Sequence, residues 1–359
     1  MYLCLQKTIP VAMNQPHTSL PPSSQLLRDS LAPRSLPGER GASESRSKTD
    51  GRSRQLRRNQ LRAYLVSFRL RTLPLSLSGI FLGSLLARAD GHFRWDAFGW
   101  AVATTLCLQI LSNLANEWGD LQKGTDNADR LGPIRSIQSG GLSLREFKRM
   151  IAVFAGLSAV CGCALIYTAF EHLFTRDGLV MLGLGAAAMV AAVKYTVGKG
   201  AYGYRGLGDL FVFLFFGLLS VCGSYFLLAE SLSAWVFLPA SAIGMLSAGV
   251  LNLNNMRDID NDRKCGKRTL PVMMGIPRAK IYHYALIAGA FLCMGGYVAA
   301  RGGGSRGWLF LVTLPLFAGH IAKVARNEGR ELDAQLKVLS LATLLFALLG
   351  GCQTGFSPV

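Results

Sequence analysis

Charged side chains are scarce in this chain of 359 residues: Asp, Glu, Lys and Arg together make up 16% of it, whereas 50% of the residues are hydrophobic. The length alone would allow two soluble domains. Soluble domains usually carry about 25% charged residues, and the mean hydropathy of this chain is positive, +0.31. The composition therefore argues against a soluble protein and favours one that lies mostly in a membrane.

Side chains that bind transition metals are also few. The five histidines, His17, His92, His172, His283 and His320, are scattered without the spacing of metal ligands, and we interpret them as structural or interfacial. Most of the eight cysteines lie in apolar stretches, where a thiol acts as a small hydrophobic group, and none forms a C-x-x-C pair. The sequence thus predicts neither a disulfide framework nor a histidine or cysteine metal site.

The first 60 residues lack a hydrophobic segment, and their few apolar side chains cannot bury enough surface to offset the entropy of ordering. They carry ten Lys or Arg residues against four acids. Without an apolar core the segment is not a secretory signal, and the acids Asp29, Glu39, Glu44 and Asp50 count against a transit peptide. We expect residues 1–60 to be a disordered, basic cytoplasmic tail that can touch anionic lipid, or translated sequence upstream of the true start.

From Leu61 onward the chain is organised as nine apolar stretches of about 20 residues, the length that crosses a bilayer. Many contain Gly, Ala and Ser, which allow helices to pack closely in lipid. We therefore predict an all-α, polytopic membrane protein whose transmembrane domain covers residues 61–359. The nine predicted spans are 66–87, 97–116, 150–170, 177–196, 207–228, 234–256, 281–300, 307–325 and 336–353.

Lys and Arg concentrate in alternate loops of this arrangement. The loops after the second and the sixth span are the most basic, whereas those on the opposite side hold only Arg88, Arg94, Arg176, Arg301 and Arg306. The positive-inside rule then places the N-terminus and the basic loops in the cytoplasm and the C-terminus outside, across a bacterial inner membrane. Basic cytoplasmic loops explain the net charge of +17, so we do not expect nucleic acid as a partner.

Two acidic motifs follow apolar stretches, one in each half of the chain. In the second half, Asp258 and Asp262 are four residues apart, which puts both carboxylates on one face of a continuing helix. In the first half, Asn116 and Asp120 are also four apart, with Glu117 beside them. A single motif of this kind could be a solvated helix end with a loop of mixed charge. Two copies favour a shared function.

Oxygen ligands in these motifs indicate Mg²⁺, which usually keeps several waters and takes phosphate oxygens as further ligands. Two carboxylates at the end of an apolar helix would repel each other unless a cation lies between them. Basic residues follow both motifs, Lys123 and Arg130 in the first half and Lys267 and Arg268 in the second. Two such helix ends that face each other could hold a diphosphate through bridging Mg²⁺.

These motifs resemble those of the UbiA superfamily of intramembrane prenyltransferases, in which paired aspartate-rich motifs bind Mg²⁺ and a prenyl diphosphate. The similarity is greatest to the branch of 1,4-dihydroxy-2-naphthoate polyprenyltransferases of menaquinone synthesis, and it covers roughly Leu61 to the C-terminus. It rests on FRLRTLPLSLSGIFLGS (68–84), NLANEWGDLQKGTD (113–126), KYTVGKGAYGYRGLGDLFVFLFFG (194–217) and NNMRDIDNDRKCGKRTL (254–270). The family usually has Asp where this chain has Glu117, which keeps the carboxylate but changes its reach.

The resemblance implies a UbiA-like bundle that transfers a polyprenyl group from polyprenyl diphosphate to 1,4-dihydroxy-2-naphthoate, releases CO₂ and gives demethylmenaquinone, with Mg²⁺ as cofactor and the lipid bilayer as surroundings. The residues expected to be catalytic and to bind the metal are Asn116, Asp120, Asp258 and Asp262, with Glu117 as a further metal ligand. The residues expected to bind substrate are Arg71, Lys123, Asp126, Arg135, Lys199, Arg205, Asn255 and Lys267.

Arg69 and Arg71 lie near the start of the first predicted span and could bind phosphate. An arginine near the start of a span is costly unless it faces a polar cavity, and a guanidinium group matches phosphate oxygens in a bidentate way. The alternative is that both side chains reach to the membrane interface.

Two other functions stay open. The first is the same chemistry on another aromatic acceptor, such as 4-hydroxybenzoate. The second is a divalent-cation transporter, because acids within a membrane can mark an ion path. The acids here gather at two helix ends beside basic loops and form no ladder across the bilayer, which favours the enzyme.

Overall fold

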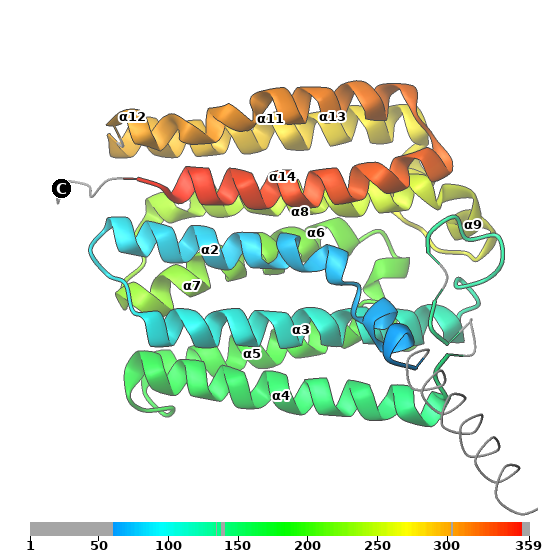
Figure 1. The fold of residues 1–359 in the computed structure, drawn as a ribbon, viewed down its shortest axis with the longest axis horizontal. Helices are drawn as coiled ribbons and strands as arrows, with labels where there is room; N and C mark the ends of the chain where they lie inside the picture. Colours follow the sequence, from blue (N-terminus) through cyan, green and yellow to red (C-terminus); the bar gives the residue numbers. More distant parts are fainter. Residues whose placement is uncertain (1–59, 134, 138–140, 303, 354–359) are drawn as a thin grey trace, which may run out of the picture. The chain divides into compact units, whose positions relative to one another are not determined.

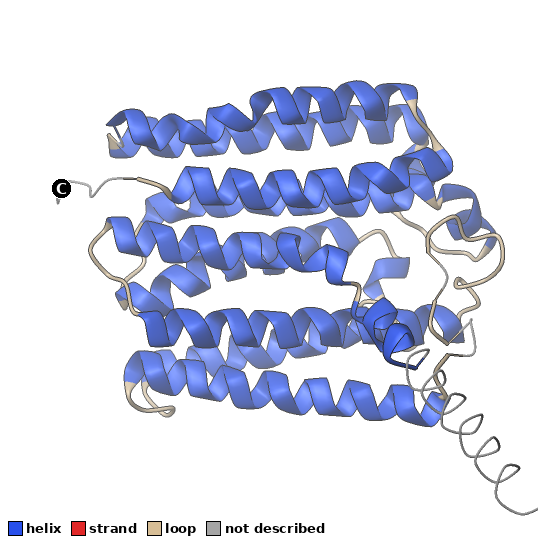
Figure 2. Cartoon of the chain, viewed as in Figure 1, coloured by secondary structure: helices blue, strands red, loops and turns tan. Residues whose placement is uncertain are grey.

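The computed structural model describes residues 60–133, 135–137, 141–302 and 304–353. Its secondary structure is helical throughout, and no strand occurs in these ranges (Figure 2). The predicted all-α class is therefore confirmed for the described part of the chain. The predicted basic tail lies outside the described residues, apart from Gln60.

Nine helical stretches of the described chain are long and apolar enough to cross a membrane, as the sequence predicts. They are Gln60–Ala89, Trp95–Gln122, Leu144–Phe170, Arg176–Lys194, Gly208–Ala229, Ala234–Arg257, Ile276–Arg301, Gly304–Arg326 and Gly329–Gly351. The third was expected from residue 150 but begins at Leu144, because Ser143 and Glu146 form a capping box that satisfies the first N–H groups of the helix. The protein is a multi-pass membrane protein.

Long helices form the bundle and short ones join or interrupt them. The long helices are α2 (Leu73–Ala89), α3 (Trp95–Gln122), α4 (Leu144–Phe170), α5 (Arg176–Lys194), α7 (Ser220–Ala229), α8 (Phe237–Arg257), α11 (Ile276–Arg301), α13 (Leu314–Arg326) and α14 (Asp333–Gly351). The short elements are η1 (Leu70–Thr72), η2 (Tyr202–Tyr204), α6 (Gly208–Val212), the π-helical segment η3 (Phe213–Leu219), η4 (Ala234–Val236), α9 (Ile259–Lys264), α10 (Leu270–Met274), α12 (Gly304–Gly307), η5 (Trp308–Thr313) and η6 (Gly329–Leu332).

The helices of residues 60–353 run side by side (Figure 1). Helix α3 packs on α4 and α5, while α8 packs on α11, α14 and η3, and α2 contacts α7 and α14. The carboxyl ends of α3 and α8 lie at the same end of the bundle, where the loop after α3 lies beside α9 (Figure 1). There Asn261 Nδ2 donates a hydrogen bond of 2.9 Å to the Thr125 carbonyl. The fold thus brings the two acidic motifs to one end.

Close approach of helices replaces the hydrophobic effect as the source of packing in lipid. Gly217 of η3 and Gly244 of α8 meet so closely that a Cβ atom on either would clash with the other helix. The core around α8 is fully buried and includes Ile243, Leu246 and Phe346. This packing holds η3 against α8, where both line the cavity described next.

Candidate active site

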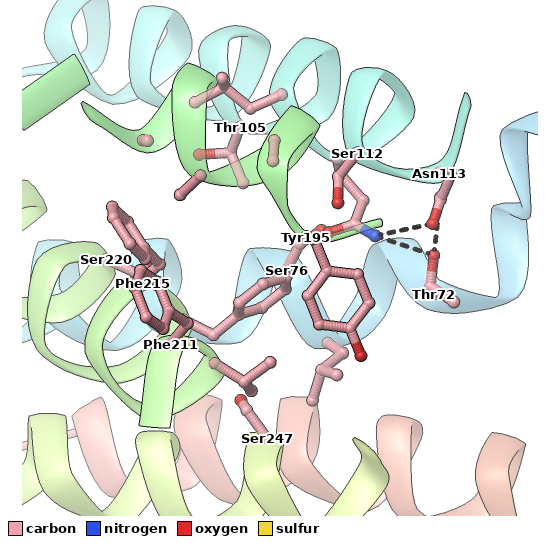
Figure 3. Close-up of a pocket in the computed structure, with 18 of the residues that line it drawn as sticks. Thr72, Ser76, Thr105, Ser112, Asn113, Tyr195, Phe211, Phe215, Ser220 and Ser247 are labelled. Carbon is pink, nitrogen blue, oxygen red and sulfur yellow. Dashed lines mark hydrogen bonds between the residues drawn. The ribbon is translucent and has the colours of Figure 1, made fainter. Parts of the chain in front are cut away.

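A cavity of about 380 Å³ lies between helices of the two halves of the bundle (Figure 3). Its lining is charged near the carboxyl ends of α3 and α8 and apolar farther in, where Ile80, Leu165 and Leu227 face it. Along α3 the lining runs from Asp120 to Ala101, which is about 28 Å of helix. The site can therefore receive a ligand with a charged head and a long hydrocarbon chain.

Both acidic motifs line the charged end of this cavity. Asn116 and Asp120 come from the last turns of α3, and Asp258 and Asp262 from the junction of α8 with α9. The helix bends at Asp258 but its hydrogen bonding continues, since Asp262 N donates to the Asp258 carbonyl at 2.9 Å. The structure thus brings together the four side chains that the sequence analysis selected as catalytic.

Asp120 and Asp262 both interact with the charge of one ammonium group, that of Lys267. Lys267 Nζ lies 3.7 Å from Asp262 Oδ1, and Tyr204 Oη donates a hydrogen bond of 2.8 Å to Asp120 Oδ1. Burial raises the pKa of Asp262 to about 6, although Lys267 opposes the shift. Burial would lower the pKa of Lys267, but the charges of Asp120 and Asp262 outweigh it and raise that pKa above its usual range. The two motifs are therefore electrostatically coupled.

Asp258 is held by the arginine that precedes it. Arg257 Nε and Nη2 donate to its two carboxylate oxygens at 3.0 and 2.6 Å, and Arg257 Nη1 contacts Asp333. Arg130 Nη2 lies 3.9 Å from the same carboxylate. Burial would raise the pKa of Asp258, but the hydrogen bonds and charge of Arg257 outweigh it and the pKa is lowered. Asp258 is therefore kept ionised.

Asp126 lies outside the cavity and contacts two arginines that line it. Its Oδ1 lies 3.2 Å from Arg130 Nε and 3.3 Å from Arg135 Nε. Both arginines line the cavity, whereas Asp126 is not among the lining residues. The expected contact of Asp126 with substrate is thus replaced in this geometry by a role in orienting two arginines.

The oxygen atoms of the two motifs fit Mg²⁺. Asn116 Oδ1 and Asp262 Oδ2 are buried, and within the described residues neither has a hydrogen-bond partner. Buried acceptors without donors are costly, and a hard cation would satisfy them. No group of three or more His, Cys, Asp or Glu side chains in the described ranges is arranged to hold a metal. An ion here would need amide, water or phosphate oxygens as well, which is the usual mode of Mg²⁺ binding.

Arg69 presents unpaired donors to the same end of the cavity. Its Nε and Nη2 are buried and have no partner among residues 60–133, 135–137, 141–302 and 304–353. Its backbone adopts φ 49°, in the left-handed region that is strained for such a residue. Arg71, Arg130, Arg135 and Lys267 also line the cavity. This cluster of cations can compensate an anion with the charge of a diphosphate.

Other predicted site residues lie away from the cavity. Glu117 is buried, and its Oε1 accepts hydrogen bonds from Ser136 Oγ at 2.6 Å and from Ile137 N at 3.2 Å. Its Oε1 is thus held by the loop after α3, whereas its Oε2 is buried without a hydrogen-bond partner among the described residues, and Glu117 does not line the cavity. Asn255 is buried outside the cavity lining. Lys199 and Arg205 are exposed and belong to one loop, where Arg205 Nη2 donates to the Lys199 carbonyl.

Lys123 lies next to the cavity and does not line it. Its Nζ is 3.8 Å from the centroid of the Tyr204 ring, and Lys267 Nζ is 5.3 Å from the same centroid. Both ammonium groups therefore contact the tyrosine that donates to Asp120. Lys123 can affect the acidic motif through this ring.

Three residues of the charged end were not predicted from the sequence. Asn254 lines the cavity, and its spacing of four from Asp258, the same as Asn116 from Asp120, was a signal that could have found it. Arg257 was not among the predicted site residues, although it donates to both carboxylate oxygens of Asp258. Asp333, which contacts both Arg71 and Arg257, carries no motif and stands 76 residues from Arg257, so only the fold reveals it.

Comparison with known proteins agrees with the family that the motifs resemble. The model of the UbiA prenyltransferase family matches residues 76–349. The chain is 40% identical to 1,4-dihydroxy-2-naphthoate octaprenyltransferase of Haemophilus influenzae, over 83% of this chain and 98% of that protein. It is 43% identical to the Escherichia coli protein of the same name, over 78% of this chain and 88% of that one. A UbiA homolog from Archaeoglobus fulgidus, solved bound to GPP and Mg²⁺, has a TM-score of 0.53 at 18% identity and covers 80% of this chain and 98% of that one.

Proposed function

The chain belongs to the UbiA prenyltransferase family, and from that premise we propose that it transfers a polyprenyl group from polyprenyl diphosphate to 1,4-dihydroxy-2-naphthoate. The products are demethylmenaquinol, which is the reduced form of demethylmenaquinone, together with diphosphate and CO₂. The observation that carries the proposal is the cavity that joins a charged end, with two acidic motifs, to an apolar interior. The names of the relatives from H. influenzae and E. coli support this choice of acceptor.

Asn116, Asp120, Asp258 and Asp262 would hold Mg²⁺ in this proposal, and the bound Mg²⁺ and GPP of the A. fulgidus homolog support the assignment. When bound, Mg²⁺ would supply charge compensation for the leaving diphosphate. Asn254 has the same spacing from Asp258 as Asn116 from Asp120 and lines the cavity, but its Oδ1 accepts a hydrogen bond of 2.9 Å from Arg257 Nη2 and would have to give up this bond to bind the ion. Lys267 would remain between the two motifs as a fixed positive charge.

The arginines of the charged end bind the diphosphate. Arg69 and Arg130 offer planar donor groups that match phosphate oxygens, and Asp126 fixes the orientation of Arg130 and Arg135. As the bond between carbon and oxygen stretches, negative charge grows on the leaving group, and these preorganised cations stabilise it. The apolar walls exclude water from the allylic cation, which the electron-rich ring then captures.

Loss of CO₂ completes the reaction without a strong base. The ring carbon that bears the carboxylate forms the new bond to carbon, and that carbon carries no proton. Cleavage of its bond to the carboxylate returns an electron pair to the ring and restores aromaticity. Few side chains in the apolar part of the cavity could act as a general base, which is compatible with this route.

The membrane orientation is part of the proposal. Basic residues crowd the loops after the second and sixth spans, so the positive-inside rule places the charged end of the cavity at the cytoplasmic face of a bacterial inner membrane and the C-terminus outside. The charged head of the polyprenyl diphosphate and the water-soluble acceptor would then reach the charged end of the cavity from the cytoplasmic side.

The test is an assay of the purified protein in lipid nanodiscs with Mg²⁺, a polyprenyl diphosphate and acceptor labelled at the carboxyl carbon. We expect labelled CO₂ to be released in step with unlabelled prenylated product. A parallel reaction contains labelled 4-hydroxybenzoate, whose prenylated product would retain the label. Transfer to 4-hydroxybenzoate alone, or a naphthoate product that keeps its label, would contradict the proposal.

A further inference from the structure

The apolar part of the cavity contains a buried hydroxyl group without a partner. Ser247 of α8 is 1% exposed and lines the cavity, and in the described structure its Oγ has no hydrogen-bond partner. Other hydroxyl groups in these helices behave differently. Ser78, Ser158 and Ser340 each donate to the carbonyl four residues earlier, which is the usual way to satisfy a hydroxyl within a membrane helix.

Gln109 of α3 presents a fixed acceptor to the same cavity. Asn113 Nδ2 donates to the Phe68 carbonyl, so Asn113 Oδ1 faces the other way and accepts from Gln109 Nε2 at 3.3 Å. Gln109 Nε2 also donates to Thr72 Oγ1 at 3.2 Å; these bonds are drawn in Figure 3. Both amide hydrogens are thus used, which leaves Oε1 as the atom of this amide that can meet a ligand. The network determines which way this amide points.

The two groups lie at the same depth. Gln109 precedes Asp120 by eleven residues on α3, and Ser247 precedes Asp258 by eleven residues at the end of α8. Eleven residues are about three turns, so each group lies on the face of its acid and about 16 Å farther from the charged end. Two walls of the cavity therefore each carry a polar group, about three helical turns below the acidic motif of the same wall.

Aromatic side chains surround this level. Phe211 stacks on Tyr202 with 3.9 Å between ring centroids, and Phe211 and Phe215 face the cavity from the side of η3 and α6 (Figure 3). Ser220 Oγ is also unpaired, but it lies against Gly79 of α2, where a Cβ atom would clash with it. Ser247 and Gln109 thus present polar groups to the cavity beside these aromatic rings.

We propose that Ser247 and Gln109 form the acceptor subsite and bind the ring hydroxyl that lies farthest from the charged end, with the aromatic side chains of α6 and η3 against the ring. The inference rests on the proposed function. A prenyl chain has no polar atom beyond its diphosphate and would leave both groups unsatisfied. A phenolic hydroxyl can donate to Gln109 Oε1 and accept from Ser247 Oγ. Because the carbon at position 2 must face the allylic cation, the 4-hydroxyl group points away from the diphosphate.

Equilibrium binding in lipid nanodiscs with Mg²⁺ and inorganic pyrophosphate tests this subsite without turnover. The ligands are 1,4-dihydroxy-2-naphthoate and 1-hydroxy-2-naphthoate, which lacks the 4-hydroxyl group. We expect the wild-type protein to bind the first about 3- to 10-fold more tightly, as for one buried hydrogen bond. Ser247→Ala and Gln109→Met should each reduce this preference, because each variant keeps the other hydrogen-bonding group. The control is Ser84→Ala, which removes a buried, unpaired hydroxyl that does not line the cavity.

The outcomes separate the two proposals. If Ser247→Ala keeps the wild-type preference, or if Ser84→Ala removes it as well, the subsite is wrong whatever the protein catalyses. If Ser247→Ala reduces the preference but the chain transfers no prenyl group to the naphthoate, the subsite stands and the proposed reaction fails. With an active protein, Ser247→Ala should raise KM for the acceptor and leave KM for polyprenyl diphosphate unchanged; a rise in both would contradict the assignment to the acceptor.

Discussion

Replacement of Asp262 by Asn tests the acidic motifs most directly. Asn has nearly the same shape, so the cavity keeps its form, but the site loses one negative charge and one oxygen ligand of high affinity for Mg²⁺. Lys267 loses a partner at 3.7 Å, an interaction of about 4 kcal/mol at an effective dielectric constant of 20 before desolvation is counted. Its ammonium group keeps the favourable charge of Asp120, so we expect the protein to fold.

The expected effect of Asp262→Asn is on the chemical step. Loss of one preorganised electrostatic group usually slows an enzyme by about 10²- to 10³-fold, or about 2.7–4 kcal/mol. The Mg²⁺ concentration for half-maximal rate should rise at least tenfold, since even indirect ligands change metal affinity by about 10- to 100-fold. Both quantities come from initial rates measured across a Mg²⁺ titration of protein in nanodiscs.

Asp260→Asn is the matched control for Asp262→Asn. Asp260 belongs to the same short helix, but its side chain is 85% exposed and contacts only Arg263 at the surface, where an ion pair contributes little. We expect its rate and Mg²⁺ dependence to equal those of the wild type. The reasoning would be refuted if Asp262→Asn kept more than a tenth of the wild-type rate at saturating Mg²⁺, or if Asp260→Asn lost activity to the same extent.

Three further predictions follow from the structure. Arg69→Lys keeps the charge but loses the planar donors, so KM for polyprenyl diphosphate should rise about tenfold while KM for the acceptor stays constant; the exposed Arg62→Lys is the control, and equal effects would exclude a special role for Arg69. In single-cysteine variants, an impermeant thiol reagent should label Cys265 only from the cytoplasmic side and Cys352 only from outside; the opposite pattern would reverse the orientation. Removal of residues 1–57 with a new start codon should leave prenyl transfer unchanged, because the cavity is built from later residues, and lost activity at normal membrane levels would assign that segment a role.

The helical part of the fold could be predicted because each membrane span is a continuous apolar stretch of the sequence. The exact start of α4 could not, since the capping box of Ser143 and Glu146 lies in a polar segment that hydropathy does not count. The break at Arg69, which divides the first span, was also not predicted. It depends on a left-handed backbone conformation that non-glycine residues rarely adopt.

The candidate site likewise contains residues that could be predicted from the sequence and residues that could not. The four residues Asn116, Asp120, Asp258 and Asp262 could be found because helical spacing fixes which side chains share a face. Their surroundings could not, because the ion pair of Arg257 with Asp333 and the hydrogen bond from Tyr204 to Asp120 join segments that are distant in sequence. Charge alone also does not distinguish a side chain that lines a cavity from one that supports it, as Asp126 shows.

In the two halves of the chain, charged residues beside the motif side chains point in opposite directions. Next to Asn116, Glu117 turns to the outside of α3 and binds Ser136 and Ile137, which anchors the loop that carries Arg135. Next to Asp258, Arg257 turns inward and takes both oxygens of that carboxylate. The departure from the usual Asp at position 117 therefore falls on a residue that shapes a loop. Its longer side chain can be accommodated there without any change in the cavity, because the oxygen atoms that face the cavity on α3 belong to Asn116 and Asp120.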